Sequence, residues 1–191
     1  MAPLPCMKRD RDQQDLLRQI AWQSLRHGIQ YGRHLEPDLD ALPRAFCEPA
    51  ACFVTLHKNG RLRGCIGSME ASDPLAKAVA WASFSAGFRD PRFPSLKSEE
   101  MDELALEISI LSPMQDLPVS SEQDLLSTLR PGIDGLLLEE HWRHAVYLPS
   151  VWEQLPEPSE FVRQLKIKGG WPGDYWSDDM RAKRFQSEII S

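Results

Sequence analysis

The segment from Ala51 to Met69 reads ACFVTLHKNGRLRGCIGSM and predicts a β-hairpin. Asn59-Gly60 separates two runs with strand composition, and this dipeptide is the strongest short-range signal for a two-residue type I′ turn. In the second run, Gly64 precedes Cys65 and Gly67 follows it two residues later. Because glycine has no side chain, a ligand or another backbone segment can approach this part of the strand closely. The hairpin is therefore expected to carry the candidate site.

The turn also predicts which side chains of the hairpin share a face. If Asn59-Gly60 are the two turn residues, Lys58 pairs with Arg61, Leu56 with Arg63, Val54 with Cys65 and Cys52 with Gly67. Side chains alternate along a strand, so one face is expected to carry Cys52, Val54, Arg61, Arg63 and Cys65. The other, mostly apolar face is assigned to the core and is expected to carry Phe53, Thr55, His57, Leu62 and Ile66. A β-bulge would change this register.

Cys65 is the candidate reactive group of the hairpin. The thiolate is the nucleophilic form of cysteine, and the charge of Arg63 on the same face would favour it. In this register His57 points away from Cys65 and is a poor candidate base. The alternative is that Cys65 is a small apolar residue of the fold, because the sequence identifies no base for a nucleophile. Cys52 is expected roughly 7–8 Å away, slightly too far for an unstrained disulfide.

Two further segments carry candidate binding residues. Arg89 and Arg92 flank Asp90 in FRDPRFP, residues 88–94, and arginine forks bind carboxylate or phosphate groups. The alternative, which we favour, is a proline-stiffened loop whose Arg–Asp pair holds its own shape. Glu107, on a predicted strand over 104–111, is either a candidate general base or a solvated residue of the strand face.

Composition limits the class of protein. A net charge of -6 over 191 residues argues against a protein that coats nucleic acid or an anionic membrane. No apolar run approaches the roughly 18 residues of a membrane span, and residues 1–10 do not resemble a signal peptide. A cytoplasmic location is therefore expected, with Cys6, Cys47, Cys52 and Cys65 as reduced thiols. Their spacing completes no zinc set, so no metal is expected.

The rest of the chain predicts a mixed fold. Residues 1–11 are expected to form a disordered leader and residues 12–191 a single domain, which is long enough to bury a core without disulfides. Helices are expected at 12–31, 75–86, about 125–129, 151–155 and 159–168, a second hairpin over 136–148, and a final strand over 184–190.

Three segments resemble the hallmark segments of the AMMECR-domain family. They are LRGCIG at 62–67, FRDPRFP at 88–94 and LEISILSP at 106–113. The match extends in order over roughly residues 12–190. The chain departs from the family pattern at Lys168-Gly-Gly-Trp-Pro172, where many members resemble Lys-Ala-Gly-Leu. It departs again at the turn 141–144, which reads HWRH and is not rich in glycine.

The resemblance implies an α+β fold with antiparallel β-sheets and packed helices in two subdomains, with a cleft between them. Its bacterial and archaeal members are called AmmeMemoRadiSam system protein A. It implies two partners, a radical S-adenosylmethionine enzyme and a Memo-like protein related to non-haem iron extradiol dioxygenases. It supplies neither an activity nor a cofactor, and the sequence does not indicate the oligomeric state.

Two functional hypotheses remain open from the sequence. In the first, the protein is an enzyme or redox component that uses Cys65, with Arg63 steering the thiol and Gly64 and Gly67 leaving room for a substrate. In the second, it is a non-catalytic binding or assembly module for those partners, with Trp171 and Trp176 exposed as contact surface. Nucleic-acid binding is the least favoured reading, because the chain is acidic and has no basic-aromatic stripe.

Overall fold

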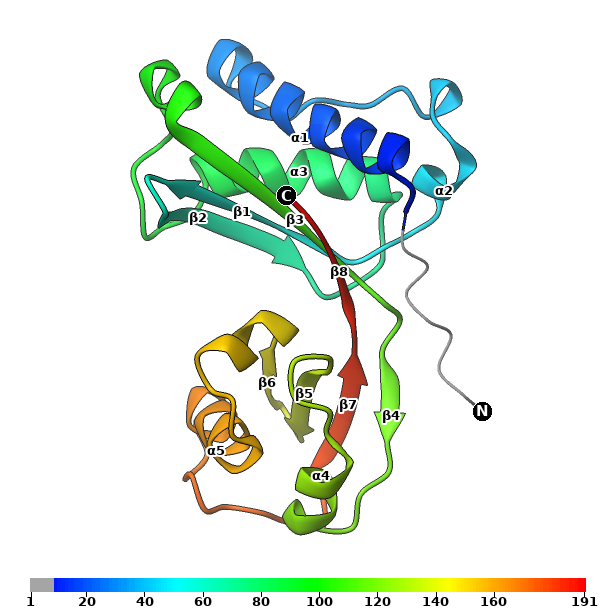
Figure 1. The fold of residues 1–191 in the computed structure, drawn as a ribbon, viewed down its shortest axis with the longest axis vertical. Coiled ribbons are helices and arrows are strands. Elements are labelled where there is room, and N and C mark those ends of the chain that lie inside the picture. Colours follow the sequence, from blue (N-terminus) through cyan, green and yellow to red (C-terminus); the bar gives the residue numbers. More distant parts are fainter. Residues whose placement is uncertain (1–8) are drawn as a thin grey trace. The chain divides into compact units, whose positions relative to one another are not determined.

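The computed structural model describes residues 9–191, so most of the predicted leader, and Cys6, lie outside the described part. The chain divides into two compact units. Within the described residues, the N-terminal unit comprises 9–111 and 188–191, and the C-terminal unit comprises 112–187. Each unit has its own four-stranded sheet with packed helices (Figure 1). The predicted α+β class with two sheet-containing subdomains is confirmed.

The N-terminal unit is a sheet of order β2-β1-β3-β8 with helices on one face. Helices α1 and α3 both pack on that face, and α3 lies directly against β1 and β2. The elements, in chain order, are α1 (Arg11–Tyr31), η1 (Leu39–Ala41), α2 (Arg44–Cys47), β1 (Cys52–Lys58), β2 (Arg61–Ser68), α3 (Leu75–Phe88), η2 (Ser98–Glu103), β3 (Leu104–Leu111) and β8 (Ser187–Ile190).

Helix α1 begins at Arg11, one residue before the predicted start, because Asp10 caps it. The Asp10 carboxylate accepts a hydrogen bond from the Gln13 amide at 2.9 Å, and the Gln13 side chain accepts one from the Asp10 amide at 3.3 Å. This reciprocal capping box gives hydrogen-bond acceptors to two backbone amides that have none within the helix. Asp10 and Arg11, which fall within the predicted leader, are the cap and the first residue of this helix.

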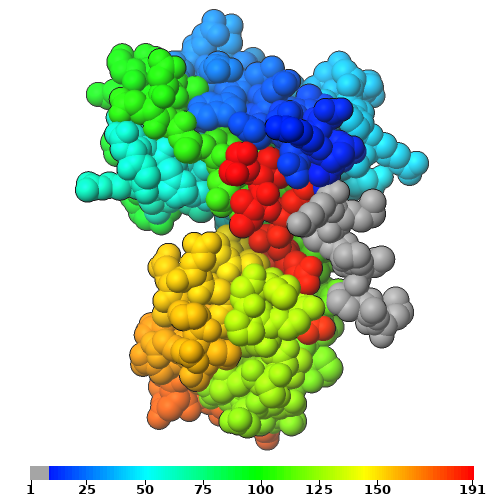
Figure 2. Space-filling view, in the orientation of Figure 1, coloured from blue at the N-terminus to red at the C-terminus, as the bar shows by residue number. Residues whose placement is uncertain are grey.

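A buried ion pair ties the last strand to the start of α1. The Arg9 guanidinium donates to Glu188 in β8 at 2.6 Å, and the Arg9 amide donates to the same carboxylate at 2.8 Å. Gln14 donates to Glu188 as well, at 3.3 Å. Figure 2 shows the last residues of the chain (red) beside the start of α1 (dark blue). Residues 174 or more positions apart in sequence are therefore held in one unit.

The C-terminal unit is a sheet of order β4-β7-β5-β6 with its own apolar core. Phe161 and Trp152 form the centre of that core, with stacked rings 3.8 Å apart. The predicted final strand over 184–190 is wrong, because the chain leaves one sheet at Gln186 and enters the other. The elements are β4 (Gln115–Leu117), α4 (Glu122–Thr128), β5 (Gly135–Glu140), β6 (Arg143–Tyr147), η3 (Pro149–Glu153), α5 (Pro158–Lys168) and β7 (Arg181–Phe185).

Trp171 is buried, so its predicted role as exposed contact surface is wrong. Only 3% of its surface is exposed, its ring lies over Gly169, and its Nε1 donates to Glu140 at 2.9 Å. A side chain at Gly169 would collide with the ring, so this glycine and the tryptophan are a matched pair. Hydrogen bonds from Ser177, Trp171 and Tyr175 hold the pKa of buried Glu140 below its usual range.

The register of the β1–β2 hairpin differs from the prediction. Lys58 pairs with Arg61 as predicted, but the register then shifts between His57 and Leu56. Leu56 opposes Gly64 in place of Arg63, and every later pair is displaced by one residue. The shift is a β-bulge, which places one extra residue in β2.

The predicted assignment of the core face of β1 is also wrong. Cys52, Val54 and Leu56 are the β1 residues that face the helices, and each is at most 2% exposed. Phe53, Thr55 and His57, predicted to be core, lie on the other face and are only half-buried. Cys65 opposes Thr55 and therefore shares this second face.

The glycines of the hairpin are approached by the protein's own backbone. A side chain at Gly64 would collide with the backbone of Ala86 in α3, and one at Gly67 would collide with Cys52 and Phe53 of β1. At Gly64 the backbones of α3 and β2 therefore come into close contact. Such contact is the physical reason that a glycine is needed within a strand.

We expect Gly64→Ala to lower the free energy of unfolding by at least about 3 kcal/mol, because the colliding Ala86 atoms are backbone and cannot rotate away. Urea unfolding followed by circular dichroism measures the change. Leu62→Ala, at a 42% exposed position of the same strand, is the control and should change stability by less than about 1 kcal/mol. Equal stability of the two variants would contradict this account of the α3–β2 contact.

Candidate functional site

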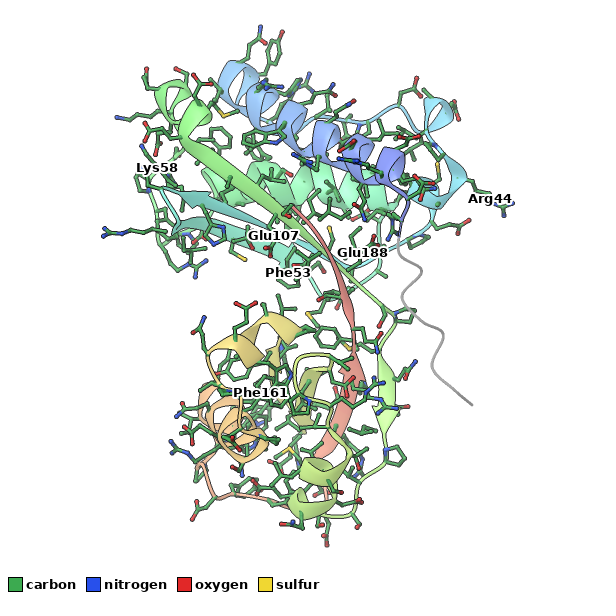
Figure 3. All side chains as sticks on the ribbon, viewed as in Figure 1. Arg44, Phe53, Lys58, Glu107, Phe161 and Glu188 are labelled. Carbon is green, nitrogen blue, oxygen red and sulfur yellow. The ribbon has the colours of Figure 1, made fainter. Side chains whose placement is uncertain are left out.

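Three side chains form a row across the sheet face that lies away from α1 and α3. Thr55 in β1 pairs with Cys65 in β2 on one side and with Glu107 in β3 on the other. Cross-strand partners share a face, with neighbouring Cβ atoms about 4.5–5.5 Å apart. Glu107 is labelled in Figure 3 together with Phe53, which lies on the same face two residues from Thr55. The structure thus brings Cys65 and Glu107 to either side of a threonine hydroxyl.

The sulfur of Cys65 accepts a hydrogen bond. Thr55 Oγ1 donates to Cys65 Sγ at 3.3 Å, and the cysteine is free and half-buried. The sulfur therefore lies in contact with a polar hydroxyl on the sheet face and is not packed among apolar side chains. The sequence predicts Thr55 to lie in the core. No sequence signal reveals its contact with the thiol, because the contact depends on the bulge.

The other two cysteines of the described chain are in different environments. Cys52 lies in the helix-facing core, and burial raises the pKa of its thiol to about 12. Cys47 Sγ donates to the Leu39 carbonyl oxygen at 3.5 Å. Cys65 is therefore the cysteine among residues 9–191 whose sulfur accepts a hydrogen bond from a side-chain hydroxyl.

An Asp–Arg pair clamps the backbone of Cys65. Asp90 Oδ2 accepts the Cys65 amide at 2.9 Å, and Arg92 Nη2 donates to the Cys65 carbonyl oxygen at 3.3 Å. The two side chains are joined at 2.9 and 2.7 Å, and Arg92 holds the pKa of the Asp90 carboxyl far below its usual range. Because β2 is an edge strand, the pair occupies backbone groups that another strand could otherwise bind.

Arg89 is not part of this clamp. Its side chain is exposed, and its guanidinium lies 5.1 Å from the centre of the Phe84 ring. The structure thus places Asp90 and Arg92 against Cys65 and leaves Arg89 at the surface.

Arg63 does not lie beside the Cys65 thiol as predicted, because the bulge places it in a different contact. Its guanidinium is buried against Glu100, with Nε and Nη2 donating at 2.9 and 3.0 Å, and Nη2 also donates to the Pro94 carbonyl oxygen. This pairing lowers the pKa of Glu100 to about 2. The positive charge of Arg63 is thereby matched by a carboxylate away from the sulfur.

His57 lies on the same face as Cys65, which corrects the prediction that it points away. It is two residues from Thr55 in β1, so their side chains share that face. No hydrogen bond joins the His57 ring to Cys65 within residues 9–191. Over the same described range, no group of three His, Cys, Asp or Glu side chains is placed to hold a metal ion.

The comparison with known families identifies the group to which this site belongs. A family model described as AMMECR1 matches residues 18–190. The chain belongs to the AMMECR1 family. The match includes the hairpin and β3, which carry the row of Cys65, Thr55 and Glu107, and the loop that carries the Asp90–Arg92 pair.

The relatives extend over nearly the whole chain. A protein of Methanothermobacter thermautotrophicus is 38% identical over 182 residues, which cover 94% of each chain. Protein MJ0810 of Methanocaldococcus jannaschii is 36% identical over 80% of this chain and 78% of its own length. The crystal structure of uncharacterized protein PH0010 from Pyrococcus horikoshii has a TM-score of 0.86 at 30% identity, covering 95% of this chain and 92% of the other. The similarity thus supports the family and the fold.

Across residues 9–191, no helix is both long enough and apolar enough to cross a membrane.

The Arg63–Glu100 pair should make stability depend on acid pH. The pKa of Glu100 is lowered from 4.5 to about 2 in the folded protein, so the stabilisation is complete above about pH 4.5 and is lost as the pH falls towards 2. Glu100→Gln should remove this part of the pH dependence and cost about 2–4 kcal/mol at pH 7, since buried Arg63 loses its partner. Urea unfolding between pH 2 and pH 7 measures both effects.

Glu99→Gln is the control for this pH experiment, because Glu99 is exposed and forms no salt bridge within the described residues. It should keep the wild-type profile. An unchanged profile in Glu100→Gln would show that the pair does not produce the dependence. Part of the slope should remain in Glu100→Gln, because the lowered pKa of Asp90 acts in the same direction.

Proposed function

We propose that the protein acts through the thiol of Cys65, as a cysteine-dependent enzyme or redox component. One observation carries this proposal: the Thr55 hydroxyl donates a hydrogen bond to the Cys65 sulfur on the sheet face that α1 and α3 leave uncovered. By contrast, the Cys52 thiol of the same hairpin is buried and has a pKa raised to about 12. The hairpin therefore carries one thiol buried in the core and one half-buried thiol that contacts a hydroxyl on the opposite face.

The surrounding residues have distinct roles in this proposal. The Asp90–Arg92 clamp fixes the Cys65 backbone, which restricts the directions that the sulfur can take. Glu107, which pairs with Thr55 on its other side, would hold a polar or cationic group of the substrate. Exposed Arg89 is available to an anionic group, while Arg63, Gly64 and Gly67 maintain the hairpin geometry.

Thiol–disulfide exchange is the simplest chemistry for this arrangement. The Cys65 thiolate would attack one sulfur of a partner disulfide, a new S–S bond would form as the old one breaks, and the departing thiolate would take up a proton. Cys52 faces the core and Cys47 lies in α2, so neither described cysteine shares the Cys65 face to resolve the product. A second thiol, from a partner or a small molecule, would therefore release it.

The partners follow from the family resemblance. We propose that Cys65 serves a radical S-adenosylmethionine enzyme and a Memo-like protein in the AmmeMemoRadiSam system. The family match spans both compact units, which supports residues 12–191 acting as a single AMMECR-type domain. A reduced thiol needs a reducing compartment, so the proposed site of action is the cytoplasm.

Removing the hydroxyl of Thr55 should slow the reaction of Cys65 with iodoacetamide. A hydrogen bond to a charged group contributes about 1.5 kcal/mol or more, so Thr55→Val should lower the alkylation rate at neutral pH by roughly tenfold. Mass spectrometry of the alkylated peptide measures the rate at Cys65 alone. Thr55→Ser keeps the hydroxyl and is the matched control. Equal rates in wild type and Thr55→Val would overturn the proposed stabilisation.

Cys65→Ser is the corresponding test in the pathway. It should abolish the product of the reconstituted radical enzyme and Memo-like protein while leaving the circular dichroism spectrum unchanged. Cys52→Ala should leave the product intact if the protein remains folded. Full product formation by Cys65→Ser would show that the thiol is not required.

A non-catalytic binding module is the second candidate, favoured by the turn between β5 and β6. Trp142 is 81% exposed at this turn, and the Arg143 guanidinium lies 5.0 Å from the centre of its ring. Exposed tryptophan with arginine is typical of binding hot spots. This turn is also one of the two places where the chain departs from the family pattern.

In the second candidate, Trp142→Ala should reduce co-purification with the radical enzyme or the Memo-like protein at least about tenfold, because loss of a hot-spot tryptophan often costs 2 kcal/mol or more. Tyr31→Ala removes another exposed aromatic side chain and is the control. Cys65→Ser should retain binding. If Trp142→Ala binds both partners as well as the wild type does, the turn is not the contact surface.

A further inference from the structure

His57 lies on the sheet face that carries the Cys65 row, next to the centre of that row. It is two residues from Thr55 in β1, and Thr55 pairs with Cys65 in β2 and with Glu107 in β3. Side chains two residues apart on a strand share a face. His57 is therefore a diagonal neighbour of Cys65, roughly 7–8 Å away between backbones, which is within the reach of an aromatic side chain.

The imidazole ring of His57 has no partner that would occupy its nitrogens. Within residues 9–191, no hydrogen bond or salt bridge engages this ring, although the residue is half-buried. By contrast, His27 Nδ1 lies 2.9 Å from the Arg33 carbonyl oxygen, and His34 Nε2 lies 2.8 Å from a carboxylate oxygen of Glu36. Both ring nitrogens of His57 are thus available to a ligand that lies on the sheet face.

The cross-strand neighbours of His57 leave the ring accessible. Its partners are Leu62 in β2 and Ala105 in β3, and both of these residues are exposed. The side chain of Ala105 ends at its Cβ atom, and helices α1 and α3 pack on the opposite face of the sheet. A substrate that lies over Thr55 therefore meets the Cys65 sulfur on one strand and the His57 ring farther along the next.

Thiol–disulfide exchange at Cys65 requires a proton close to the departing sulfur. That sulfur leaves as a thiolate, and a thiolate of the cysteine type is basic, because its thiol has a pKa of about 8.5. An S–S bond is about 2.05 Å long, so an in-line attack places the departing sulfur about 4 Å beyond Cys65 Sγ. The departing sulfur then lies within the span between Cys65 and a diagonal neighbour.

Histidine is the side chain on this face that suits a proton transfer. The other ionisable groups that the register of β1, β2 and β3 places there are Cys65 itself and Glu107, while the Asp90–Arg92 pair binds the backbone of β2. Carboxyl groups ordinarily carry no proton at neutral pH, whereas an imidazole both donates and accepts one there. A side chain positioned to transfer a proton accelerates a reaction by about 10²–10⁴-fold.

We propose that His57 is a second catalytic residue of the Cys65 site and donates a proton to the sulfur that departs in thiol–disulfide exchange. This inference rests on the proposed thiol function. The Cys65 thiolate attacks one sulfur of the disulfide, and the old S–S bond breaks as the new one forms. The departing sulfur takes the proton of the His57 imidazolium, which regains one from water. The substrate class is thus a disulfide of aliphatic thiols, whose departing sulfur is basic.

The test compares the rates at which the whole protein reacts with two uncharged disulfides, 2-hydroxyethyl disulfide and 4,4′-dithiodipyridine. The first releases a basic alkyl thiolate, and the second releases an aromatic thiolate that leaves without a proton. Mass spectrometry of the mixed disulfide at Cys65 measures each rate. At neutral pH, His57→Gln should slow the alkyl reaction at least about tenfold and change the aromatic one less than about twofold. His144→Gln, which removes an exposed histidine of the C-terminal unit, should keep both rates.

The pH dependence of the wild type is a second measurement of the same role. The ratio of the alkyl to the aromatic rate should fall as the pH rises from about 5 to 8, because histidine side chains lose their proton over that range. Taking the ratio removes the ionisation of Cys65, which affects both reactions alike. In His57→Gln the ratio should stay constant, since the other ionisable groups of the face are retained.

The outcomes distinguish the role of His57 from the thiol function itself. If Cys65 reacts with both disulfides and folded His57→Gln changes neither rate, or slows both equally, the role of His57 is wrong and the thiol function stands. If wild-type Cys65 reacts with neither disulfide, both proposals are wrong. Circular dichroism checks the fold of each variant, and His57→Asn takes the place of His57→Gln if the glutamine variant does not fold.

Discussion

The close contact between Gly64 and the backbone of Ala86 is the constraint on which the N-terminal unit depends. A strand normally keeps a helix at a distance set by its side chains, but a glycine lets the two backbones meet. That contact coincides with the β-bulge, which lets Arg63 reach Glu100 while Cys65 continues in the strand. The positions of α3, β2 and η2 therefore depend on one another.

The candidate site is a consequence of that packing. Without the bulge, Cys65 would oppose Val54 and lie against the helix-facing core, as its neighbour Cys52 does. With it, the sulfur meets the Thr55 hydroxyl, and the Asp90–Arg92 pair takes up the outward backbone groups of the edge strand. The loop after α3 therefore both protects the sheet edge and fixes the position of the thiol.

The two faces of the hairpin offer two different chemistries. Cys65, Thr55 and Glu107 form a polar row on one face, suited to a nucleophile and a polar substrate group. On the other face, Cys52, Val54 and Leu56 pack into the apolar core beneath the helices. In the C-terminal unit, Gly169 leaves room for the Trp171 ring, and the ring nitrogen donates a hydrogen bond to buried Glu140. The difference from the family pattern at residues 168–172 therefore changes the packing of the interior and adds no exposed tryptophan at position 171.

Local patterns in the sequence determined the hairpin with its Asn59-Gly60 turn, the helices, the α+β class and the family, because turn chemistry and periodicity act between near neighbours. They also identified Cys65, Asp90, Arg92 and Glu107 as candidates. Only the tertiary structure decided which face Cys65 occupies, that Thr55 contacts its sulfur and that Arg63 serves Glu100. These depend on a one-residue bulge, and a shift of one residue moves a side chain to the opposite face of a sheet. The contact of α3 with Gly64, distant in sequence, accompanies that shift, so no local pattern could reveal it.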